Sequence, residues 1–245
     1  FVFNYGTRDL RVGFAFFQEN KANTLPITFP ESQTRFLQAG KSLLIEDIVL
    51  TMFGLSSAKG WLMVTTDTTW FPANSPDPEK ILVSARVYNT GGSSGGTFGQ
   101  TEGSALPYLN ASTGPTWSTG IRLDVTFRCN LGIGAFAPVG IRVHYRFRRA
   151  DGSVAAEGFK DIKANSLGQW GIDSLGVTRG SGPLSVELWL DPGAVTPNPC
   201  GDPLRANWFF AYLSPVDGAA AGQGTGDGEM VMAVPESELQ IFKCN

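Results

Sequence analysis

Short segments rich in Val, Ile, Phe and Thr recur along the chain, separated by clusters of Gly, Pro, Asn and Asp. Apolar or alternating runs of this length between turn residues are typical of short β-strands. The segments with this pattern are 10–17, 60–66, 81–88, 141–148, 184–190, 208–213 and 229–234. The pattern therefore predicts an all-β fold.

The segment 141–148 shows the alternation most clearly. One side of the predicted strand carries Ile141, Val143, Tyr145 and Phe147, and the other carries Arg142, His144, Arg146 and Arg148. Because successive side chains of a strand point to opposite faces, we expect one buried face and one solvated face. The tetrapeptide Ala150-Asp151-Gly152-Ser153 follows, and Asp-Gly readily adopts the positive φ values of a hairpin turn.

Helical periodicity is found in one segment. Its apolar residues follow the i, i+3, i+4, i+7, i+8 spacing of a buried helix face: Ile45, Ile48, Val49, Met52 and Phe53. Asp47 lies near the start and Gly54 at the end, as in a short capped helix. The simplest interpretation is a β protein with one or two short helical connections.

The second half of the chain repeats the order of signals in the first half. Both halves contain an apolar strand after an Arg, a second strand, a strand ending in Asp and a Gly-rich segment. These lie at 11–16, 24–29, 61–67 and 91–103 in the first half, and at 128–133, 141–147, 184–191 and 218–228 in the second. The offset of about 120 residues is the size of one immunoglobulin-like sandwich, although any β protein can show such an order by chance.

Pro and Gly crowd together in 107–120, as they do in linkers between domains. We therefore expect two tandem immunoglobulin-like β-sandwich modules, an N-terminal one at 1–106 and a C-terminal one at 121–245, joined by a linker at 107–120.

Composition narrows the class of protein. Of 245 residues, 42% are hydrophobic and 17% charged, which is too apolar for a disordered chain. No apolar run is long enough to span a bilayer, and a net charge of −3 without a basic stripe argues against a nucleic-acid partner. The chain begins at Phe1 without an initiator Met or a charged leader, as expected of an exported protein after signal-peptide removal, and equally of a trimmed chain.

The three cysteines match no metal-binding or redox spacing. Cys129 alternates with Phe127 and Leu131, so we expect it to face the core as a small apolar residue. Cys200 lies in a turn-rich loop and Cys244 is the penultimate residue, which makes these two the better candidates for a disulfide in an exported protein.

The candidate chemistry for catalysis is sparse. His144 is the only histidine, it lies between two arginines, and no carboxylate is adjacent in sequence, so we expect a surface residue. The phosphate-loop lookalike at 40–42 lacks its first Gly, and the dinucleotide lookalike at 132–137 is followed by Pro138 where a helix must begin. We therefore expect a protein that is not an enzyme, with no catalytic residue, no cofactor and no metal site.

Loop carboxylates and exposed aromatic residues are the remaining candidates for binding. The carboxylates lack the spacing of a calcium loop, so we expect them to be solvated: Asp67, Asp77, Glu79, Asp191 and Asp202. Most aromatic residues should lie in the core. Trp70, beside a Pro-rich loop, and Trp117, in the expected linker, have contexts that leave them candidates for a ligand platform.

Three strings resemble a poorly characterised family of bacterial exported tandem β-sandwich repeat modules: Ser84-Ala85-Arg86-Val87-Tyr88-Asn89, Gly96-Thr97-Phe98-Gly99-Gln100 and Phe127-Arg128-Cys129-Asn130-Leu131-Gly132. The likeness is thin but covers most of the chain. The family usually has Thr at the place of Cys129, and an apolar Pro-containing segment at the place of Thr101-Glu102-Gly103. The resemblance implies export, a β-sandwich and a role in surface architecture or attachment, with no catalytic residues.

The sequence therefore predicts a non-catalytic structural or protein-interaction module that is secreted, periplasmic or on the bacterial cell surface. Its expected partners are other proteins or further copies of itself in an extracellular assembly. The alternative is a carbohydrate-binding module that uses exposed aromatic residues to hold a glycan.

Overall fold

A computed structural model describes residues 1–26, 28–66, 81–89, 98–102, 109–111, 113–124, 127–195, 207–217 and 230–235. The predicted all-β class is confirmed: the described elements are strands apart from one short α-helix and three 3₁₀ turns. Every strand pair in the described part joins two strands of the same half of the chain. We refer to the two halves as the N-terminal and C-terminal modules.

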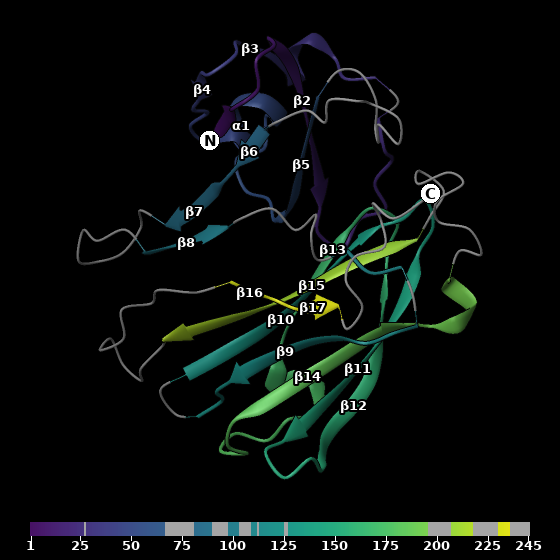
Figure 1. Cartoon of the computed structure of the whole chain (residues 1–245). Coiled ribbons are helices and arrows are strands. Elements are labelled where there is room, and N and C mark those ends of the chain that lie inside the picture. The colour runs from purple at the N-terminus through teal and green to yellow at the C-terminus, as the bar shows by residue number, and fades with distance from the viewer. Residues whose placement is uncertain are drawn as a thin grey trace.

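The N-terminal module contains a three-stranded N-outer sheet (order β4-β1-β6), a three-stranded N-inner sheet (β3-β2-β5) and a β7-β8 hairpin (Figure 1). Its elements are β1 (Val2–Asn4), β2 (Leu10–Gln18), η1 (Glu31–Gln33), β3 (Thr34–Leu37), β4 (Ser42–Leu43), α1 (Ile48–Phe53), β5 (Gly60–Thr66), β6 (Ile81–Val83), β7 (Ala85–Asn89) and β8 (Phe98–Glu102).

The C-terminal module is a sandwich of a four-stranded C-inner sheet (β13-β10-β15-β16) and a five-stranded C-outer sheet (β12-β11-β14-β9-β17). Its elements are β9 (Thr116–Ile121), β10 (Phe127–Phe136), β11 (Ile141–Arg149), β12 (Val154–Ile162), β13 (Leu167–Gly171), η3 (Ile172–Leu175), β14 (Leu184–Leu190), η4 (Pro192–Ala194), β15 (Trp208–Asp217), β16 (Val231–Met232) and β17 (Val234–Pro235).

The four sheets are stacked as layers, and three apolar clusters lie between them. Residues of the first cluster, such as Val2 of β1 and Phe14 of β2, fill the N-terminal module. The second joins the N-inner to the C-inner sheet, with Trp61 of β5 near Phe210 of β15. The third fills the C-terminal sandwich. Among the described residues, both inner sheets are therefore covered on both faces, and each outer sheet is covered on one face.

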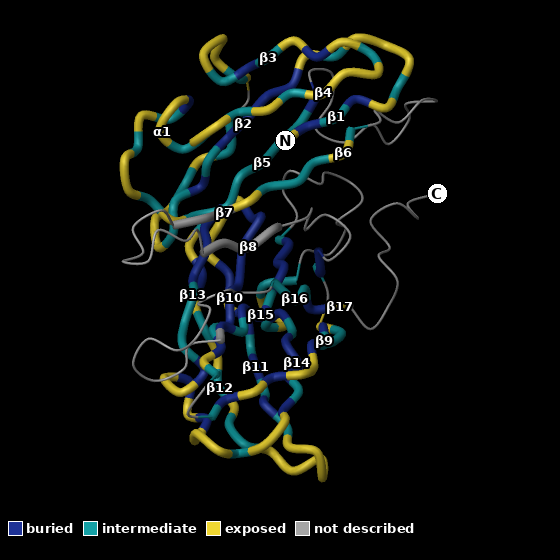
Figure 2. The backbone as a smooth tube through the Cα atoms, turned by 90° about the vertical axis from the view of Figure 1, so that its left-hand side faces the viewer, coloured by how far each residue is buried: buried dark blue, intermediate teal, exposed yellow. Residues whose placement is uncertain are grey.

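The two modules are closed to different degrees. In Figure 2 the buried stretches concentrate in the C-terminal module, whereas β4 and β6 are intermediate or exposed. Among the described residues, the C-terminal core contains 23 buried and 6 partly buried apolar residues. The N-terminal core contains 5 buried and 9 partly buried ones. The N-terminal core is therefore smaller and less shielded from water.

Both modules nevertheless share one scheme of four antiparallel pairings among six strands. The strands β1 to β6 pair as β1-β4, β1-β6, β2-β3 and β2-β5. In the C-terminal module the four equivalent pairings, given in the same order, are β9-β14, β9-β17, β10-β13 and β10-β15. The main addition in the C-terminal module is the β11-β12 hairpin, which extends the C-outer sheet beyond β14.

This scheme corrects several details predicted from the sequence. The segment 24–29 is not a strand in its described part, because Pro26 lacks an N–H donor and Leu25 packs into the contact between the modules. The segment 61–67, which contains most of β5, occupies the same place in the pairing scheme as β15. It does not match 184–191, which contains β14. The expected linker ends too late, since Thr116–Ile121 forms β9. The immunoglobulin-like label stays a prediction.

Other local predictions are confirmed. The helix α1 begins after Asp47, whose carboxylate accepts from the Leu50 N–H at 3.3 Å, and ends at Gly54. The strand β11 has the expected buried and solvated faces. The turn into β12 contains Gly152 at φ +83°, a value that favours glycine.

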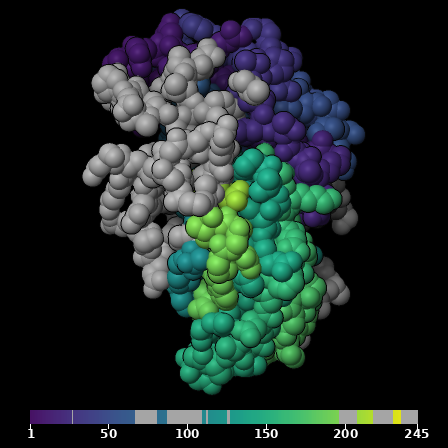
Figure 3. All heavy atoms as spheres, turned by 90° about the vertical axis from the view of Figure 1, so that its right-hand side faces the viewer, coloured from purple at the N-terminus to yellow at the C-terminus, as the bar shows by residue number. Residues whose placement is uncertain are grey.

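The contact between the modules is aromatic. Trp61 stacks on Phe17 with ring centroids 4.3 Å apart, and its edge contacts are Phe136 at 6.1 Å and Phe210 at 6.0 Å. Gly134 lies directly beneath the Phe210 ring, where a Cβ atom would collide with it. In Figure 3, atoms of the N-terminal module rest directly on those of the C-terminal module. The two modules are therefore packed directly against each other.

Two loops add hydrogen bonds to this contact. The Asn23 side chain donates to the Asn165 carbonyl at 2.9 Å, and the Asn165 side chain donates to the Asn23 carbonyl at 3.1 Å. Asn165 is 4% exposed, and its Oδ1 accepts from the Ala137 N–H at 3.1 Å. The Lys163 ammonium donates to the Asn20 carbonyl at 2.9 Å. Reciprocal bonds of this kind fix the relative orientation of the two modules.

Candidate functional site

The uncovered surface of the C-outer sheet, which we call the polar face, gathers the charged and aromatic candidates. Alternation along β11 and β14 places Leu188 and Val143 in the core and sends their neighbours outward. Strand pairing then brings these side chains together: Glu157, Phe159 and Asp161 from β12, Arg142, His144, Arg146 and Arg148 from β11, Glu187 and Trp189 from β14, Trp117 from β9 and Val234 from β17.

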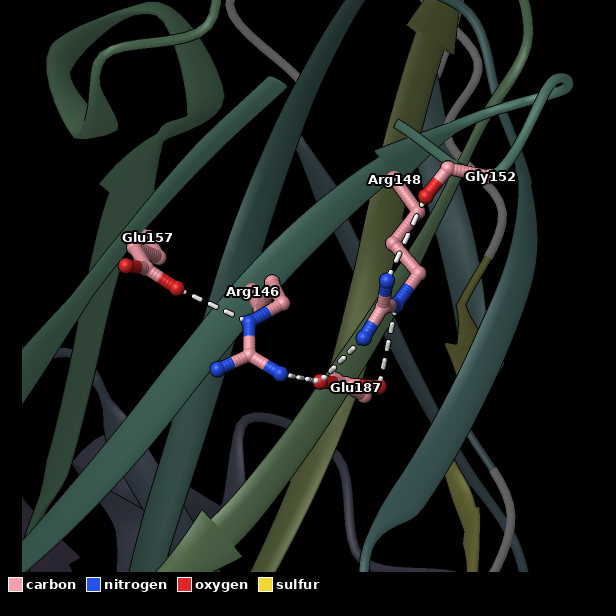
Figure 4. A network of polar contacts seen from close by, with 5 residues as sticks. All are labelled: Arg146, Arg148, Gly152, Glu157 and Glu187. Carbon is pink, nitrogen blue, oxygen red and sulfur yellow. Dashed lines mark hydrogen bonds and ion pairs between the residues drawn. The ribbon is translucent and has the colours of Figure 1, made fainter. Parts of the chain in front are cut away.

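Glu187 is the centre of an ion-pair network on the polar face (Figure 4). Its carboxylate accepts from Arg146 Nη1 at 2.7 Å and from Arg148 Nε and Nη2, each at 3.2 Å. Arg146 Nε also donates to Glu157 Oε2 at 2.8 Å. The Glu187 side chain is only 8% exposed. A nearly buried carboxylate with two guanidinium partners holds these arginines in fixed positions.

A second group of charges lies at the other end of β11. Arg142 forms a bidentate pair with Asp161 at 2.7 and 3.1 Å, and this hydrogen bonding lowers the pKa of the Asp161 carboxyl. His144 Nε2 lies 3.0 Å from Asp191 Oδ2. The hydrogen bond from His144, followed by that from the Gly193 N–H, lowers the pKa of Asp191. The Asp191 carboxylate is therefore fixed by two hydrogen bonds, and it is not the freely solvated group that the sequence predicted.

Two aromatic rings of the polar face, those of Trp189 and Phe159, each have a neighbouring side chain packed on them. His144 stacks on Trp189 with centroids 5.4 Å apart and planes 9° apart. The guanidinium of Arg146 lies 5.2 Å from the Trp189 ring centre, and that of Arg142 lies 3.9 Å above Phe159. A sugar platform needs an open ring face, so Trp189 is poorly placed for one. The rings instead hold the cationic groups in a regular array.

The residues predicted from the sequence are only partly brought together. Trp117 is half-buried on the polar face, opposite Glu187 on one side and Val234 on the other. Trp70, Cys200 and Cys244 lie outside the described residues, as do Asp67, Asp77, Glu79 and Asp202. Cys129 faces the core as predicted, and burial raises its pKa to about 12, which makes it an inert thiol.

Sequence reasoning missed Trp189 and Phe159, and it missed that Asp191 is the partner of His144. The alternation in 184–190 signals an outward Trp189, but the stack on His144 depends on strand register. Asp191 is 47 residues from His144 in sequence, so adjacency could not identify it.

The His144–Asp191 pair resembles the base and orienting acid of a hydrolase, but a nucleophile is also needed. Within the described ranges His144 has ring contacts with Trp189 and Phe159 and no serine, threonine or cysteine partner. In that same part of the chain no cluster of three or more His, Cys, Asp or Glu side chains could hold a metal. The described helices also include none that is long and apolar enough to cross a membrane.

The outward surface of the N-outer sheet, which we call the apolar face, contrasts with the polar face. Phe3 lies opposite Leu82 across β1 and β6, and its ring is 6.4 Å from that of Tyr5. Tyr5 is 55% exposed, Leu82 61% and Leu44, directly after β4, 65%. Large exposed apolar residues that share one face are typical of an interaction surface.

Fold and surfaces together define an all-β protein of four stacked sheets with two unlike outer faces. No known protein family matches the chain, and no curated protein is similar to it in sequence. One solved structure, described as the crystal structure of Thermotoga maritima 1070, is similar with a TM-score of 0.40 and 12% identity. The similarity covers 53% of this chain and 100% of the other.

Proposed function

We propose that this chain is a non-catalytic structural or protein-interaction module of an extracellular assembly, located in the periplasm, at the bacterial cell surface or in the medium. The observation that carries the proposal is the layered stack. In the described part of the chain, two outward sheet faces of different chemistry lie at opposite ends of a packed core, and the aromatic contact between the modules joins them. Such a unit can hold one partner at each end.

The composition of the polar face supports protein partners. Arginine and tryptophan are enriched at the centres of protein interfaces, where positioned guanidinium groups and rigid rings lose little entropy on binding. Arg146 and Arg148 are held by Glu187, and Trp189 is held by His144. The face is therefore preorganised before a partner arrives.

Photocrosslinking in the native source tests the proposal. A crosslinking amino acid replaces Phe159, which is 47% exposed on the polar face, and in a matched control replaces Leu50, which is 47% exposed on α1. We expect one discrete protein adduct from position 159 that is absent from position 50. Identical adduct patterns from both positions contradict a specific interaction at this face.

Carbohydrate binding is the second candidate, because Trp117, Trp189 and Phe159 share the polar face. Trp117 has no ring contact among the described residues, so it is the best-placed platform. Glycan-array binding that is lost in Trp117→Ala and retained in Trp189→Phe favours this function. The absence of any glycan signal, together with a protein adduct from position 159, favours the protein-interaction role.

A further inference from the structure

The shared pairing scheme gives β4 and β14 the same place in their modules. Each pairs antiparallel with the first strand of its module, β1 or β9. On its other side β14 pairs with β11 over Val143–Arg149. Among the described strands nothing pairs with the other side of β4, which ends the N-outer sheet. No described strand therefore fills, beside β4, the place that β11 fills beside β14.

In the C-terminal module, β11 completes the core. Val143, Tyr145 and Phe147 point inward and are at most 6% exposed. Their counterparts are missing beside β4, and the apolar side chains there remain only partly buried: Leu43, Ile45, Ile48 and Phe53. This difference accounts for part of the incomplete closure of the N-terminal core.

The backbone of β4 is suited to accept a strand on its open side. The Asn4 N–H donates to the Lys41 carbonyl at 3.0 Å, and Phe3 and Val2 lie opposite Ser42 and Leu43. In an antiparallel pair, residues alternate between bonding to the partner and pointing away from it. The Ser42 N–H and carbonyl therefore point away from β1 and toward the open edge.

A short edge strand is also a common way to avoid unwanted pairing. Two residues of β4 on their own would fit that interpretation. Proteins that protect an edge also place charge or proline along it, and here Lys41 precedes Ser42. The two residues that follow Ser42 are apolar, and Leu44 is 65% exposed. The apolar side chains beside β4 favour an accepting edge.

We propose that the N-terminal module binds an extended segment of another polypeptide as an antiparallel strand along β4. This proposal rests on the protein-interaction function and assigns it a site. The partner segment alternates, with bulky apolar residues on the side that faces Leu43 and Ile45. Main-chain hydrogen bonds to Ser42 supply affinity, and the apolar side chains supply specificity, as in other cases of strand addition.

The segment 140–149 of this chain, which contains β11, is the natural probe because it already fills the equivalent place beside β14. A synthetic peptide of this sequence is added to the intact protein, and amide hydrogen exchange is followed at Ser42 to Leu44. We expect exchange of the Ser42 amide to slow by about tenfold or more. A scrambled peptide of the same composition controls for its positive charge and should give no protection.

Substitutions at one position give a second readout. Ser42→Pro removes the N–H at the open edge but no hydrogen bond to β1, whereas Ser42→Ala retains that N–H. We expect Ser42→Pro to weaken peptide binding by about tenfold or more and Ser42→Ala to leave it unchanged. Near-UV circular dichroism identifies a Pro variant that fails to fold, in which case the exchange measurement on the unmodified protein decides.

Two results overturn the proposal: equal protection by the scrambled peptide, or no protection at Ser42 at peptide concentrations up to about 1 mM. If either occurs while the Phe159 crosslinker still captures a discrete protein, the interaction function stands and only the β4 site is lost. If no protein adduct forms and the peptide still binds, the polar face is not the interaction surface.

Discussion

The two modules share four strand pairings but differ in what surrounds them. The C-terminal module adds the β11-β12 hairpin, buries four side chains of β11 and exposes a face of paired charges. The N-terminal module lacks a described equivalent, leaves most of its core partly buried and exposes an apolar face. One pairing scheme thus yields a closed sandwich in one module and an incompletely closed one in the other. Closure is determined by the additional strands.

The largest expected effect separates the two cores. Phe147 and Phe14 are both almost fully buried, at 0% and 1% exposed. Phe147→Ala should lower the free energy of unfolding by about 3–5 kcal/mol, because its surroundings are too well packed to collapse into the cavity. Phe14→Ala should cost less, about 2–3 kcal/mol, because its partly buried neighbours can move. Urea denaturation measures both, and equal losses contradict the difference in closure.

A smaller effect is expected at the contact between the modules. Asn165→Ala leaves the Ala137 N–H and the Asn23 carbonyl without their buried partner and should cost about 2 kcal/mol. Lys163→Ala removes an exposed bond to Asn20 and should cost less than about 1 kcal/mol. Thermal unfolding of Asn165→Ala should also broaden toward two transitions. A change no larger than that of the Lys163 variant argues against coupling through Asn165.

The charged pairs test the same contrast on the surface. Glu187→Gln removes the charge shared by Arg146 and Arg148 and should lower the free energy of unfolding by about 1–2 kcal/mol, since the carboxylate is nearly buried. Glu31→Gln, its matched control in the N-terminal module, breaks the exposed pair with Arg11 and should cost less than about 1 kcal/mol. High salt should reduce the second cost more than the first. Equal costs at low salt would mean that Glu187 is effectively solvated.

The smallest effect is the pH dependence of Asp191. Its pKa is lowered in the folded protein by the hydrogen bond from His144, so its ionised form stabilises the fold above the unfolded pKa of about 3.9. This contribution is lost as the pH falls through the lower folded pKa. Asp191→Asn should therefore be less stable than the unmodified protein at neutral pH, and the difference should disappear as the pH falls through the lowered pKa of Asp191.

A second substitution assigns the cause of that pH dependence. His144→Phe preserves a ring against Trp189 but removes the donor to Asp191. This variant should lose less of its free energy of unfolding than the unmodified protein as the pH falls into the acidic range, as Asp191→Asn should. If the loss of stability at acidic pH persists in His144→Phe and disappears only in Asp191→Asn, the hydrogen bond from the Gly193 N–H is its cause instead.

Much of the fold could be predicted because local rules apply to it. Alternation in 141–148 identified both faces of β11, and Asp47 and Gly54 marked the limits of α1. The two tandem modules stay a prediction, and within it the match of 61–67 with 184–191 was wrong. An apolar segment that ends in Asp is common to many strands, and only hydrogen-bonded pairing shows that β5 corresponds to β15.

The candidate site was less predictable because it depends on residues far apart in sequence. Trp117 was a candidate for exposure in a linker, and it is instead half-buried on β9 beside Glu187. His144 showed no partner in its own segment, and the turn after β14 brings Asp191 to it. Strand register therefore decides which outward side chains become neighbours.

The sequence by itself determined that this is an all-β chain, where its best strands and helix lie, and which side of β11 is buried. These follow from periodicity and turn chemistry, which act within a few residues. Tertiary structure alone decided that the modules pack through Trp61, that Glu187 collects two arginines and that β4 ends its sheet. Each of these depends on long-range pairing and layer packing, whose partners are chosen by the whole fold and not by neighbouring residues.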